Sequence, residues 1–370
     1  MKELIHGGDI YSFNKNENII DFSANINPLG MPLSVKKAII DNIENYKAYP
    51  DPLCRSLRKA LAEKEKTSMK NILCGNGAAD IILKIALGIK PKKALILAPT
   101  FSEYEEGLKL VDCKINYYKL KEENNFFIKD DILNYLNEKI DIIFLCNPNN
   151  PTGIPLKKEG MLKILKKCIE KNIIMVVDEC FMDFIYDEEN YSISSYINEF
   201  KNLIILKAFT KIYAMAGIRL GYMLSSNEEI IDKISSIGQP WSVSSVAAFS
   251  GEAALKEKEF VNKTKVYIKE NREFLKKELK KLGFKVFDSE ANYLFFKSNI
   301  LGIKEYLKEK GILIRSCSNY VSLNKDYYRI SVKSKEDNKI LIKYLKELIY
   351  EEQKNEDYNG YNWWGRAFWL

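Results

Sequence analysis

Three polar residues that follow one apolar run have the chemistry to bind a carbonyl cofactor with an anionic group. Lys211 lies shortly after the run LIIL, Thr210 precedes it, and Arg219 lies eight residues further on. A lysine amine forms an imine with a carbonyl group, and a guanidinium and a hydroxyl group bind phosphate. Taken alone, this segment is weak evidence, because an exposed loop that carries a lysine is the more common explanation.

Two further segments place polar side chains at the ends of apolar runs. Asp178 ends the run IIMVVD, where a carboxylate is either a helix cap or a functional group. The segment NPNNPTG follows the run DIIFLC, and its prolines and glycine predict a turn. Within that turn, Asn150 is a candidate hydrogen-bond donor to a cofactor oxygen.

Small residues at the start of a predicted helix offer a further anion site. The segment GNGAAD precedes the apolar stretch IILKIALGI, so backbone N–H groups near Gly77 and Ala78 can face a phosphate. An ordinary junction between a loop and a helix is the alternative. Phe101 lies at another strand end and could stack on a planar ring, although a single phenylalanine is usually a core residue.

Apolar runs that alternate with helical patterns must position these residues. The predicted strands are Ala94–Ala98, Asp141–Cys146, Ile173–Asp178, Leu203–Leu206 and Gly221–Leu224. Continuous apolar strands separated by amphipathic helices indicate an α/β fold, with a mostly parallel sheet that helices cover on both faces. Such sheets bind ligands at the carboxyl ends of their strands.

The pattern changes near residue 257, where a smaller α+β domain is expected to begin. Its predicted elements are a charged helix over Glu257–Lys281, strands near Asn292–Lys297 and Tyr328–Val332, and a helix over Lys335–Tyr350. We therefore expect a large cofactor-binding domain over residues 41–256 and a small domain over residues 257–350. Residues 1–40 are expected to pack with the small domain.

The last twenty residues, 351–370, form an aromatic tail. Three of the four tryptophans, Trp363, Trp364 and Trp369, lie within its last eight residues. At most a few apolar residues follow one another there, which is too few for a membrane span. Packing in a dimer and docking to another partner both remain open for this tail.

Composition excludes several classes of protein. The net charge is +7 over 370 residues, but lysines alternate with acidic residues along the predicted helices, which indicates solvated faces rather than a nucleic-acid site. The seven cysteines are scattered without a CxxC pair, so we expect reduced thiols and no metal site. No signal peptide or membrane span is visible. We expect a cytoplasmic protein without nucleic-acid or membrane partners.

The segments GNGAAD, PTF, NPNNPTG, DECF and FTK followed by GIRLGY occur in this order. Together they resemble the signature set of fold-type I enzymes, which use pyridoxal 5′-phosphate (PLP) and have an aspartate-aminotransferase-like fold. The resemblance extends from about His6 to about Leu348. It points within the class I/II aminotransferases to the branch shared by histidinol-phosphate aminotransferases and threonine-phosphate decarboxylases.

The resemblance implies roles for four residues around the cofactor ring. Lys211 is similar to the lysine that binds PLP covalently and moves the proton at the substrate Cα. Asp178 is similar to the partner of the pyridine nitrogen, and Asn150 to the ligand of the phenolic oxygen. Phe101 is similar to the aromatic ring that stacks on the pyridine.

The same resemblance implies a phosphate site and a dimer. The residues similar to the phosphate-binding residues of the family are Gly77, Ala78, Thr210 and Arg219. Tyr49, in YPDP, is similar to the tyrosine that reaches the phosphate of the neighbouring subunit's cofactor. A homodimer with shared active sites follows from that similarity.

Three positions depart from the pattern of many relatives. Ala208 stands where a hydroxyl is frequent, so one phosphate contact is expected to be missing, and Lys207 stands where an arginine is frequent. Phe181 replaces a tyrosine that touches the cofactor oxygen in many aminotransferases, and a phenylalanine cannot donate that hydrogen bond. The form DECFMDF is similar to threonine-phosphate decarboxylases, so Phe181 favours that side of the branch.

Residues near both ends of the chain are candidates for binding a phosphorylated substrate. His6 is the only histidine, and the glycine after it lets it lie close to a phosphate, although a single terminal histidine can also be incidental. Arg315 and Arg329 match the decarboxylase family and are expected to hold the phosphate and carboxylate of a phospho-amino acid. The predicted substrate-binding residues are His6, Gly7, Asn25, Asn150, Arg315 and Arg329.

The function implied by the resemblance is decarboxylation of O-phospho-L-threonine to (R)-1-amino-2-propanol O-phosphate, used in cobalamin biosynthesis. In a decarboxylase the carboxylate must stand perpendicular to the cofactor ring with few cationic contacts, so the phosphate is the natural handle for orientation. A histidinol-phosphate-type aminotransferase is the first alternative, and Phe181 and the HGG opening disfavour it. A non-catalytic PLP-binding protein is the second, disfavoured by Lys211 and by the lack of a DNA-binding domain.

Overall fold

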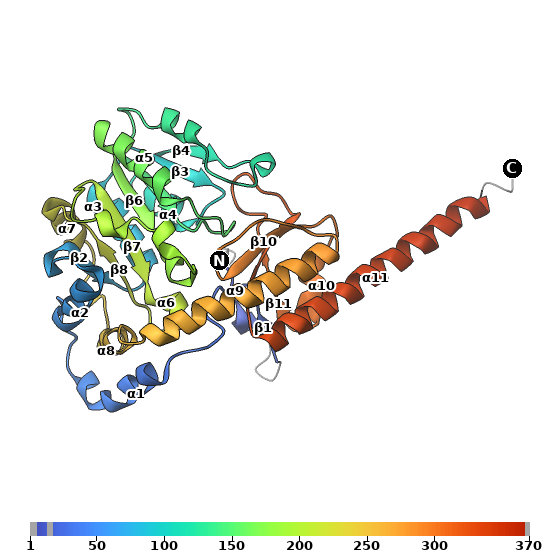
Figure 1. Cartoon of the computed structure of the whole chain (residues 1–370), viewed down its shortest axis with the longest axis horizontal. Coiled ribbons are helices and arrows are strands. Elements are labelled where there is room, and N and C mark those ends of the chain that lie inside the picture. Colours follow the sequence, from blue (N-terminus) through green and yellow to red (C-terminus); the bar gives the residue numbers. More distant parts are fainter. Residues whose placement is uncertain (1–5, 13–17, 367–370) are drawn as a thin grey trace.

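A seven-stranded sheet forms the centre of the larger part of the molecule, as the computed structural model shows (Figure 1). The structure describes residues 6–12 and 18–366, with side chains as far as residue 354. The strand order is β2 (Ile72–Gly75), β8 (Gly221–Leu224), β7 (Leu203–Ala208), β6 (Ile174–Asp178), β5 (Ile142–Cys146), β3 (Lys93–Ala98) and β4 (Lys114–Lys119). Only β8 runs antiparallel to its neighbours. The mostly parallel sheet predicted from the sequence is confirmed.

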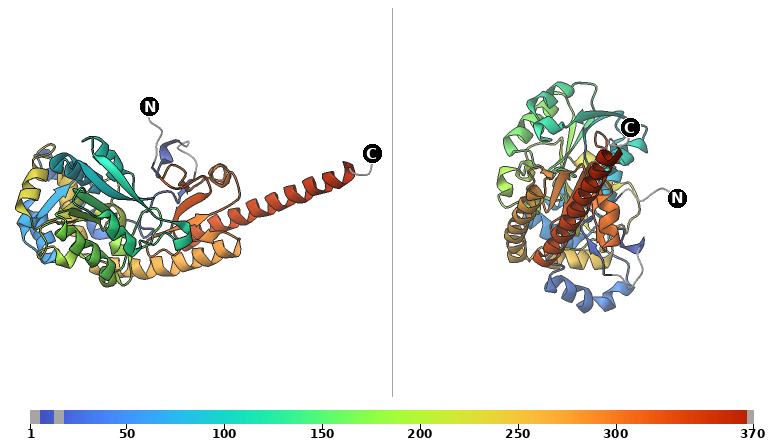
Figure 2. Two further views of the ribbon diagram at one scale, coloured as in Figure 1. Left: turned by 90° about the horizontal axis from the view of Figure 1, so that it is seen from above. Right: turned by 90° about the vertical axis from the view of Figure 1, so that its right-hand side faces the viewer.

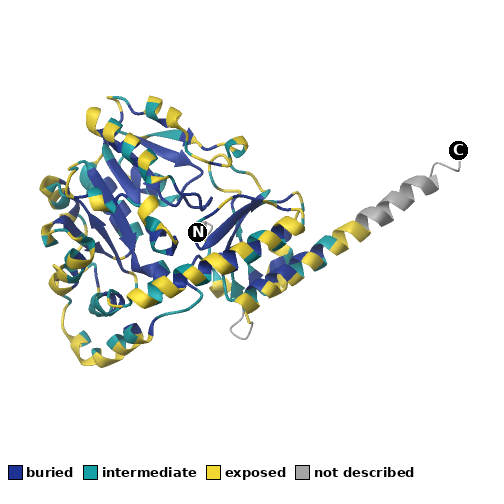
Figure 3. Ribbon diagram, in the orientation of Figure 1, coloured by how far each residue is buried: buried dark blue, intermediate teal, exposed yellow. Residues whose placement is uncertain are grey.

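The strands of this sheet are buried on both faces because helices cover each one (Figure 3). Successive side chains of a strand point to opposite faces. In β5, Ile143 and Leu145 belong to one core and Ile142 and Phe144 to the other. The helices over the second core are α3 (Ala78–Ile89), α4 (Glu103–Lys109) and α7 (Glu228–Ser235), and those over the first include α2 (Arg55–Glu65) and α5 (Lys158–Glu170). Burial on both faces explains the uninterrupted apolar runs.

The smaller part contains a four-stranded antiparallel sheet. Its strand order is β12 (Arg315–Ser316), β13 (Tyr327–Ser331), β10 (Tyr293–Lys297) and β9 (Lys285–Val286). Three helices accompany the sheet: α9 (Lys258–Lys281), α10 (Ile303–Glu309) and α11 (Lys335–Arg366). This arrangement agrees with the predicted α+β unit.

Helix α11 continues well beyond its expected end at Tyr350, and that predicted boundary is wrong. The residues that follow Tyr350, EEQKNED, include strong helix formers and no proline, so nothing in the sequence stops the helix there. Its last part extends away from the rest of the molecule both in Figure 1 and in the left-hand view of Figure 2, which is perpendicular to it. No helix in the described part of the chain is long and apolar enough to cross a membrane.

The amino-terminal segment contacts both parts of the molecule. Strand β1 (Ile20–Asp21) pairs in parallel with β11 (Ile312–Leu313) of the smaller part. Helix α1 (Leu33–Asp41) packs instead against α8 (Ser245–Ala254) of the larger part. The domain limits given above therefore stay a prediction.

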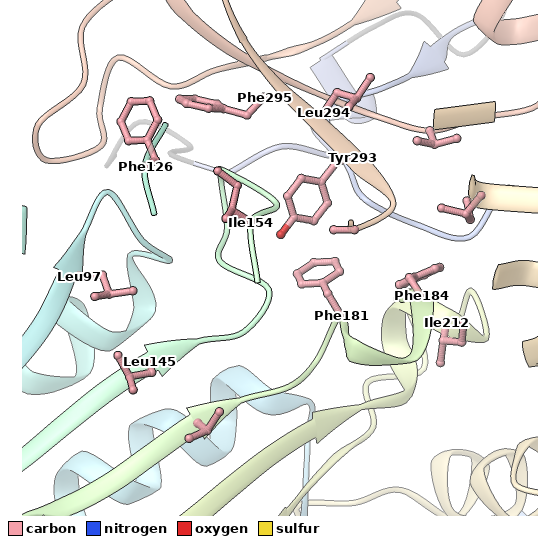
Figure 4. Packing of buried hydrophobic residues seen from close by; sticks show 14 of the residues in the cluster. Leu97, Phe126, Leu145, Ile154, Phe181, Phe184, Ile212, Tyr293, Leu294 and Phe295 are labelled. Atoms are coloured by element: carbon pink, nitrogen blue, oxygen red, sulfur yellow. The ribbon is translucent and has the colours of Figure 1, made fainter. Parts of the chain in front are cut away.

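Aromatic side chains join the two parts near the carboxyl ends of the large sheet (Figure 4). Tyr293 of β10 meets Phe181 edge to face, with ring centroids 5.1 Å apart, and its hydroxyl donates a hydrogen bond to the Asn149 carbonyl at 3.0 Å. These contacts of Tyr293 fix the turn NPNNPTG against the smaller part.

Short 3-10 helices lie in the connections, at Ile10–Ser12, Ile43–Lys47, Met69–Asn71, Glu122–Asn124, Asp130–Tyr135, Met182–Phe184, Glu188–Asn190 and Ser194–Tyr196.

Candidate active site

A cavity of about 370 Å³ lies where strands β5, β6 and β7 end and the smaller part begins. Its volume is in the range of small-molecule sites. The sequence-predicted residues that line it are His6, Gly7, Asn25, Ala78, Phe101, Asn150, Asp178, Thr210, Lys211, Arg219, Arg315 and Arg329. The fold therefore gathers residues from the whole length of the chain into one cavity.

Lys211 stands at the carboxyl end of β7, in the single turn α6 (Phe209–Ile212). The side chain borders the cavity, and the residue is half-buried. Desolvation, the nearby Arg329 guanidinium and, to a smaller extent, Arg219 lower the pKa of the Lys211 amine to about 8. A substantial fraction of the amine is therefore neutral near physiological pH, and the neutral amine is the nucleophile.

Asp178 is buried at the end of β6, and hydrogen bonds hold both of its carboxylate oxygens. Oδ1 accepts from the Cys180 backbone N–H at 2.9 Å, and Oδ2 accepts from the Tyr104 hydroxyl at 2.7 Å. Each oxygen of a carboxylate can accept about two hydrogen bonds. Asp178 therefore retains acceptor capacity toward the cavity that it lines.

Donors for an anion meet at the start of α3. The first N–H groups of a helix have no partner within the helix and favour negative charge. Gly77 has a φ of +83°, and a Cβ atom there would lie 2.5 Å from Nη2 of Arg219, so the guanidinium sits directly over the helix start. Ala78, Thr210 and Arg219 line the cavity beside it. The predicted phosphate-binding residues are thus in one place.

Arg329 and Asn150 orient each other inside the cavity wall. Nη1 of Arg329 donates to Oδ1 of Asn150 at 2.5 Å, and Nη2 donates to the Ser23 carbonyl at 2.6 Å. Because a guanidinium only donates, it engages the Asn150 oxygen and leaves the Asn150 amide nitrogen to act as a donor. That is the chemistry required of a residue that binds a phenolic oxygen.

Two buried polar atoms at the cavity lack a hydrogen-bond partner among the described residues. They are Nε of Arg329 and Oδ1 of Asn25. Buried polar atoms are normally hydrogen-bonded, so such atoms beside a cavity are consistent with a polar ligand. Asn25, a predicted substrate-binding residue, therefore has an unpaired side-chain oxygen beside the cavity.

The outer wall carries two further predicted substrate-binding residues, His6 and Arg315. His6 Nε2 lies 2.8 Å from Oε1 of Glu103, and its ring centroid is 5.9 Å from that of Phe101. Nη2 of Arg315 donates to Asn319 Oδ1 at 2.7 Å. The two side chains line the same cavity as Arg329. His6, Arg315 and Arg329 therefore border one cavity, and the acidic Glu103 beside His6 was not predicted from the sequence.

Two predicted residues do not line the cavity: Gly77, which adjoins Ala78 and Arg219 of its wall, and Tyr49. Tyr49 is 80% exposed, and its ring stacks on that of Trp241 with centroids 4.6 Å apart. A residue that acts in a neighbouring subunit would be exposed in a single chain. Its role stays a prediction.

Several functional neighbours were missed by sequence reasoning. Ser23, Glu103, Cys146 and Tyr320 line the cavity, and Tyr104 supports it through Asp178. Cys146 could have been found because it ends a predicted strand, as Asp178 does. Across the described residues, no group of three histidine, cysteine or acidic side chains is placed to hold a metal ion.

The residues of the cavity fit PLP in three respects. Lys211, whose pKa is lowered, offers a nucleophilic amine to the carbonyl group of the cofactor. The start of α3 and Arg219 offer hydrogen-bond donors and positive charge to its phosphate. Asp178 offers a buried carboxylate to a ring nitrogen. These groups come from different strand ends, so their convergence is specific to the fold.

Comparison with known proteins gives concordant similarities. The pattern of the family "Aminotransferase class I and II" matches residues 17–345. Threonine-phosphate decarboxylase of Salmonella typhimurium is 35% identical over 90% of this chain and 92% of its own length. A putative threonine-phosphate decarboxylase of Caldanaerobacter subterraneus subsp. tengcongensis is 38% identical over 95% of each chain. The crystal structure of histidinol-phosphate aminotransferase from Clostridium acetobutylicum superposes with a TM-score of 0.84 at 32% identity, covering 89% of this chain and 99% of that one.

Proposed function

The chain belongs to the aminotransferase class I and II family, and we propose that within it the protein is a PLP-dependent decarboxylase of O-phospho-L-threonine. The product is (R)-1-amino-2-propanol O-phosphate, a component for cobalamin biosynthesis. The observation that carries the proposal is the cavity that combines Lys211 with His6, Arg315 and Arg329. The similarity to two proteins named as threonine-phosphate decarboxylases supports it.

PLP, when bound, supplies an aromatic ring that withdraws electrons from the substrate Cα. Lys211 would hold the cofactor, and Asp178 would keep the ring nitrogen charged. The start of α3, Thr210 and Arg219 would bind the cofactor phosphate, Phe101 would contact the ring, and the Asn150 amide would donate to the phenolic oxygen. The lowered pKa of Lys211 lets its amine also act as a proton donor and acceptor near neutral pH.

Orientation of the substrate decides which bond at Cα breaks. His6 and Arg315 would bind the substrate phosphate at the outer wall, and this contact would orient the substrate carboxylate. A carboxylate held tightly by cations resists leaving as neutral CO₂, so binding energy is better placed on the phosphate. Arg329 already donates hydrogen bonds to Asn150 and to the Ser23 carbonyl. These bonds limit the contacts that it can make with the substrate carboxylate. Lys211 then returns a proton to Cα.

The test measures the rate of CO₂ release from phosphothreonine, phosphoserine and threonine by the purified, PLP-loaded protein. We expect CO₂ release from phosphothreonine to be much faster than from threonine, with phosphoserine intermediate. An anion site left without its phosphate has unpaired donors, which costs more than one missing methyl group. Equal rates with threonine and phosphothreonine would contradict the proposal.

The acting species is proposed to be a homodimer in the cytoplasm. Leu33, Ile40 and Ile43 are large exposed apolar residues in the same amino-terminal region as Tyr49. A second copy that covers this region would bring Tyr49 to the partner's cofactor phosphate. The seven cysteines are free and buried, which is consistent with a reducing compartment.

Subunit mixing tests the shared site. Lys211→Ala and Tyr49→Ala subunits are each weak or inactive alone, but hybrid dimers contain one site with both residues intact. Mixing should therefore restore activity. Mass spectrometry verifies that the subunits have exchanged. If activity does not rise after that exchange, a shared site is excluded.

A further inference from the structure

We propose that Tyr104 is a positioning residue, whose hydroxyl fixes the Asp178 carboxylate in the orientation that the cofactor ring nitrogen requires. The inference rests on the proposed PLP site and adds to it a residue that lies outside the cavity wall. Tyr104 does not touch the ligand space directly, so any effect on PLP must pass through its neighbours.

Tyr104 is rigidly placed behind Asp178. Its hydroxyl donates to Oδ2 of Asp178 at 2.7 Å, and both residues are buried. Its ring stacks on Phe144 with centroids 5.2 Å apart and meets the edge of Phe101 at 5.7 Å. The ring position is therefore set by packing, and the hydroxyl is aimed by the ring.

The alternation of side chains along β5 and β6 explains this meeting. Phe144 and Val176 point to the face that α4 covers, and Asp178 lies two residues after Val176 on the same face. Tyr104, on α4, is part of that same core. The end of β6 thus brings the carboxylate to the edge of this core, where Cys146 and Phe101 also border the cavity.

The hydrogen bonds to Asp178 come from two directions. The Cys180 N–H holds Oδ1, and the Tyr104 hydroxyl holds Oδ2. Burial and the neighbouring Asp178 carboxylate raise the pKa of Tyr104 well above its usual value, so the hydroxyl keeps its proton and donates. Without it, the carboxylate keeps its contacts with the backbone N–H and the thiol of Cys180 but loses the hydrogen bond to Oδ2, and the terminal torsion of an aspartate is otherwise broad.

A chemical double-mutant cycle isolates this role. Tyr104→Phe keeps the ring and its packing and removes only the hydroxyl. The cycle measures affinity of the apoprotein, by equilibrium dialysis, for PLP and for 1-deaza-PLP. This analogue keeps the formyl, hydroxyl and phosphate groups but has C–H in place of the ring nitrogen.

The variant should bind PLP about 10-fold more weakly, because a charge-assisted hydrogen bond that orients Asp178 is lost. Its affinity for 1-deaza-PLP should stay within about twofold of the wild-type affinity, because this analogue has no ring nitrogen with which Asp178 can interact. With phosphothreonine, kcat should fall while KM is retained, because the substrate phosphate is bound on the other wall.

Tyr118→Phe is the matched control. Tyr118 is also buried, and its hydroxyl also donates to an aspartate, Asp131, but neither residue lines the cavity. This variant should leave both affinities unchanged. Equal losses of PLP and 1-deaza-PLP in Tyr104→Phe, or no loss of either, would overturn the inference. Failure of the wild type to bind PLP would instead refute the proposed function.

Discussion

Replacing Gly7 by alanine tests how the amino-terminal segment positions the substrate-binding side chains. A Cβ atom on Gly7 would lie 2.3 Å from the Ser23 carbonyl oxygen and 2.7 Å from its carbon, and both atoms belong to the backbone. Cβ contacts under 3.0 Å are essentially never seen, so the two segments must separate by at least about 0.7 Å. No flexible side chain is available to absorb this shift.

Either direction of the shift disturbs a predicted substrate ligand. If the Ser23 carbonyl moves, the 2.6 Å hydrogen bond that it accepts from Arg329 lengthens toward about 3.3 Å, beyond the usual range. If the amino-terminal segment moves instead, His6 moves with it. Loss of one charge-assisted hydrogen bond costs about 1.5–3 kcal/mol, so kcat/KM for phosphothreonine should fall about 10- to 100-fold.

Steady-state kinetics and PLP binding together check this expectation. The affinity for PLP should stay within about threefold of wild type, because the cofactor contacts come from the larger part of the molecule. Gly107→Ala is the control, since this glycine of α4 has no left-handed φ and a Cβ atom there would have its nearest neighbour, the Ala86 side chain, at an ordinary 3.5 Å. An unchanged kcat/KM in Gly7→Ala, or a parallel fall in PLP affinity, would refute the reasoning.

Three further predictions concern charge. Covalent attachment of PLP to the apoprotein should accelerate with a midpoint near pH 8, where the Lys211 amine becomes neutral, and Lys211→Ala should lose both the attachment and the near-violet absorption band. Asp178→Ala should fold and bind PLP weakly but lose turnover by about two orders of magnitude or more, measured with saturating cofactor. Glu122 has its pKa lowered to about 2: burial opposes the shift, and hydrogen bonds from Lys285, Tyr327 and Lys297 outweigh it. Its stabilising effect is therefore present above about pH 4.5 and lost as pH falls toward 2, so Glu122→Gln should lower the unfolding free energy by about 1 kcal/mol at pH 7 and by progressively less in acid denaturation series.

The chemistry-bearing residues were predictable because they stand at strand ends. Asp178 and Lys211 follow uninterrupted apolar runs, and parallel strands bring their carboxyl ends to one edge of the sheet. The aspartate-aminotransferase-like fold and the family membership are confirmed by the matching family pattern and the superposed structure. The similarity to threonine-phosphate decarboxylases agrees with the branch that Phe181 and the HGG opening indicated.

The residues that support this set were not predictable from spacing. The Tyr104 hydroxyl bonds a carboxylate 74 residues away, and His6 meets Glu103 across 97 residues. Such contacts depend on how α4 and the amino-terminal segment pack, which local sequence does not determine. The end of α11 was missed for the opposite reason, since its continuation is a matter of local helix propensity that the change to aromatic residues obscured.

The most direct test of the account follows the carbon and the nitrogen of phosphothreonine in one reaction. The PLP-loaded protein is incubated with carboxyl-labelled phosphothreonine, with and without 2-oxoglutarate, and labelled CO₂, phosphorylated amine and glutamate are quantified. Decarboxylation predicts one CO₂ and one 1-amino-2-propanol phosphate per substrate consumed, at a rate that does not depend on the keto acid. Formation of glutamate without CO₂, or faster turnover with histidinol phosphate and 2-oxoglutarate, would contradict it.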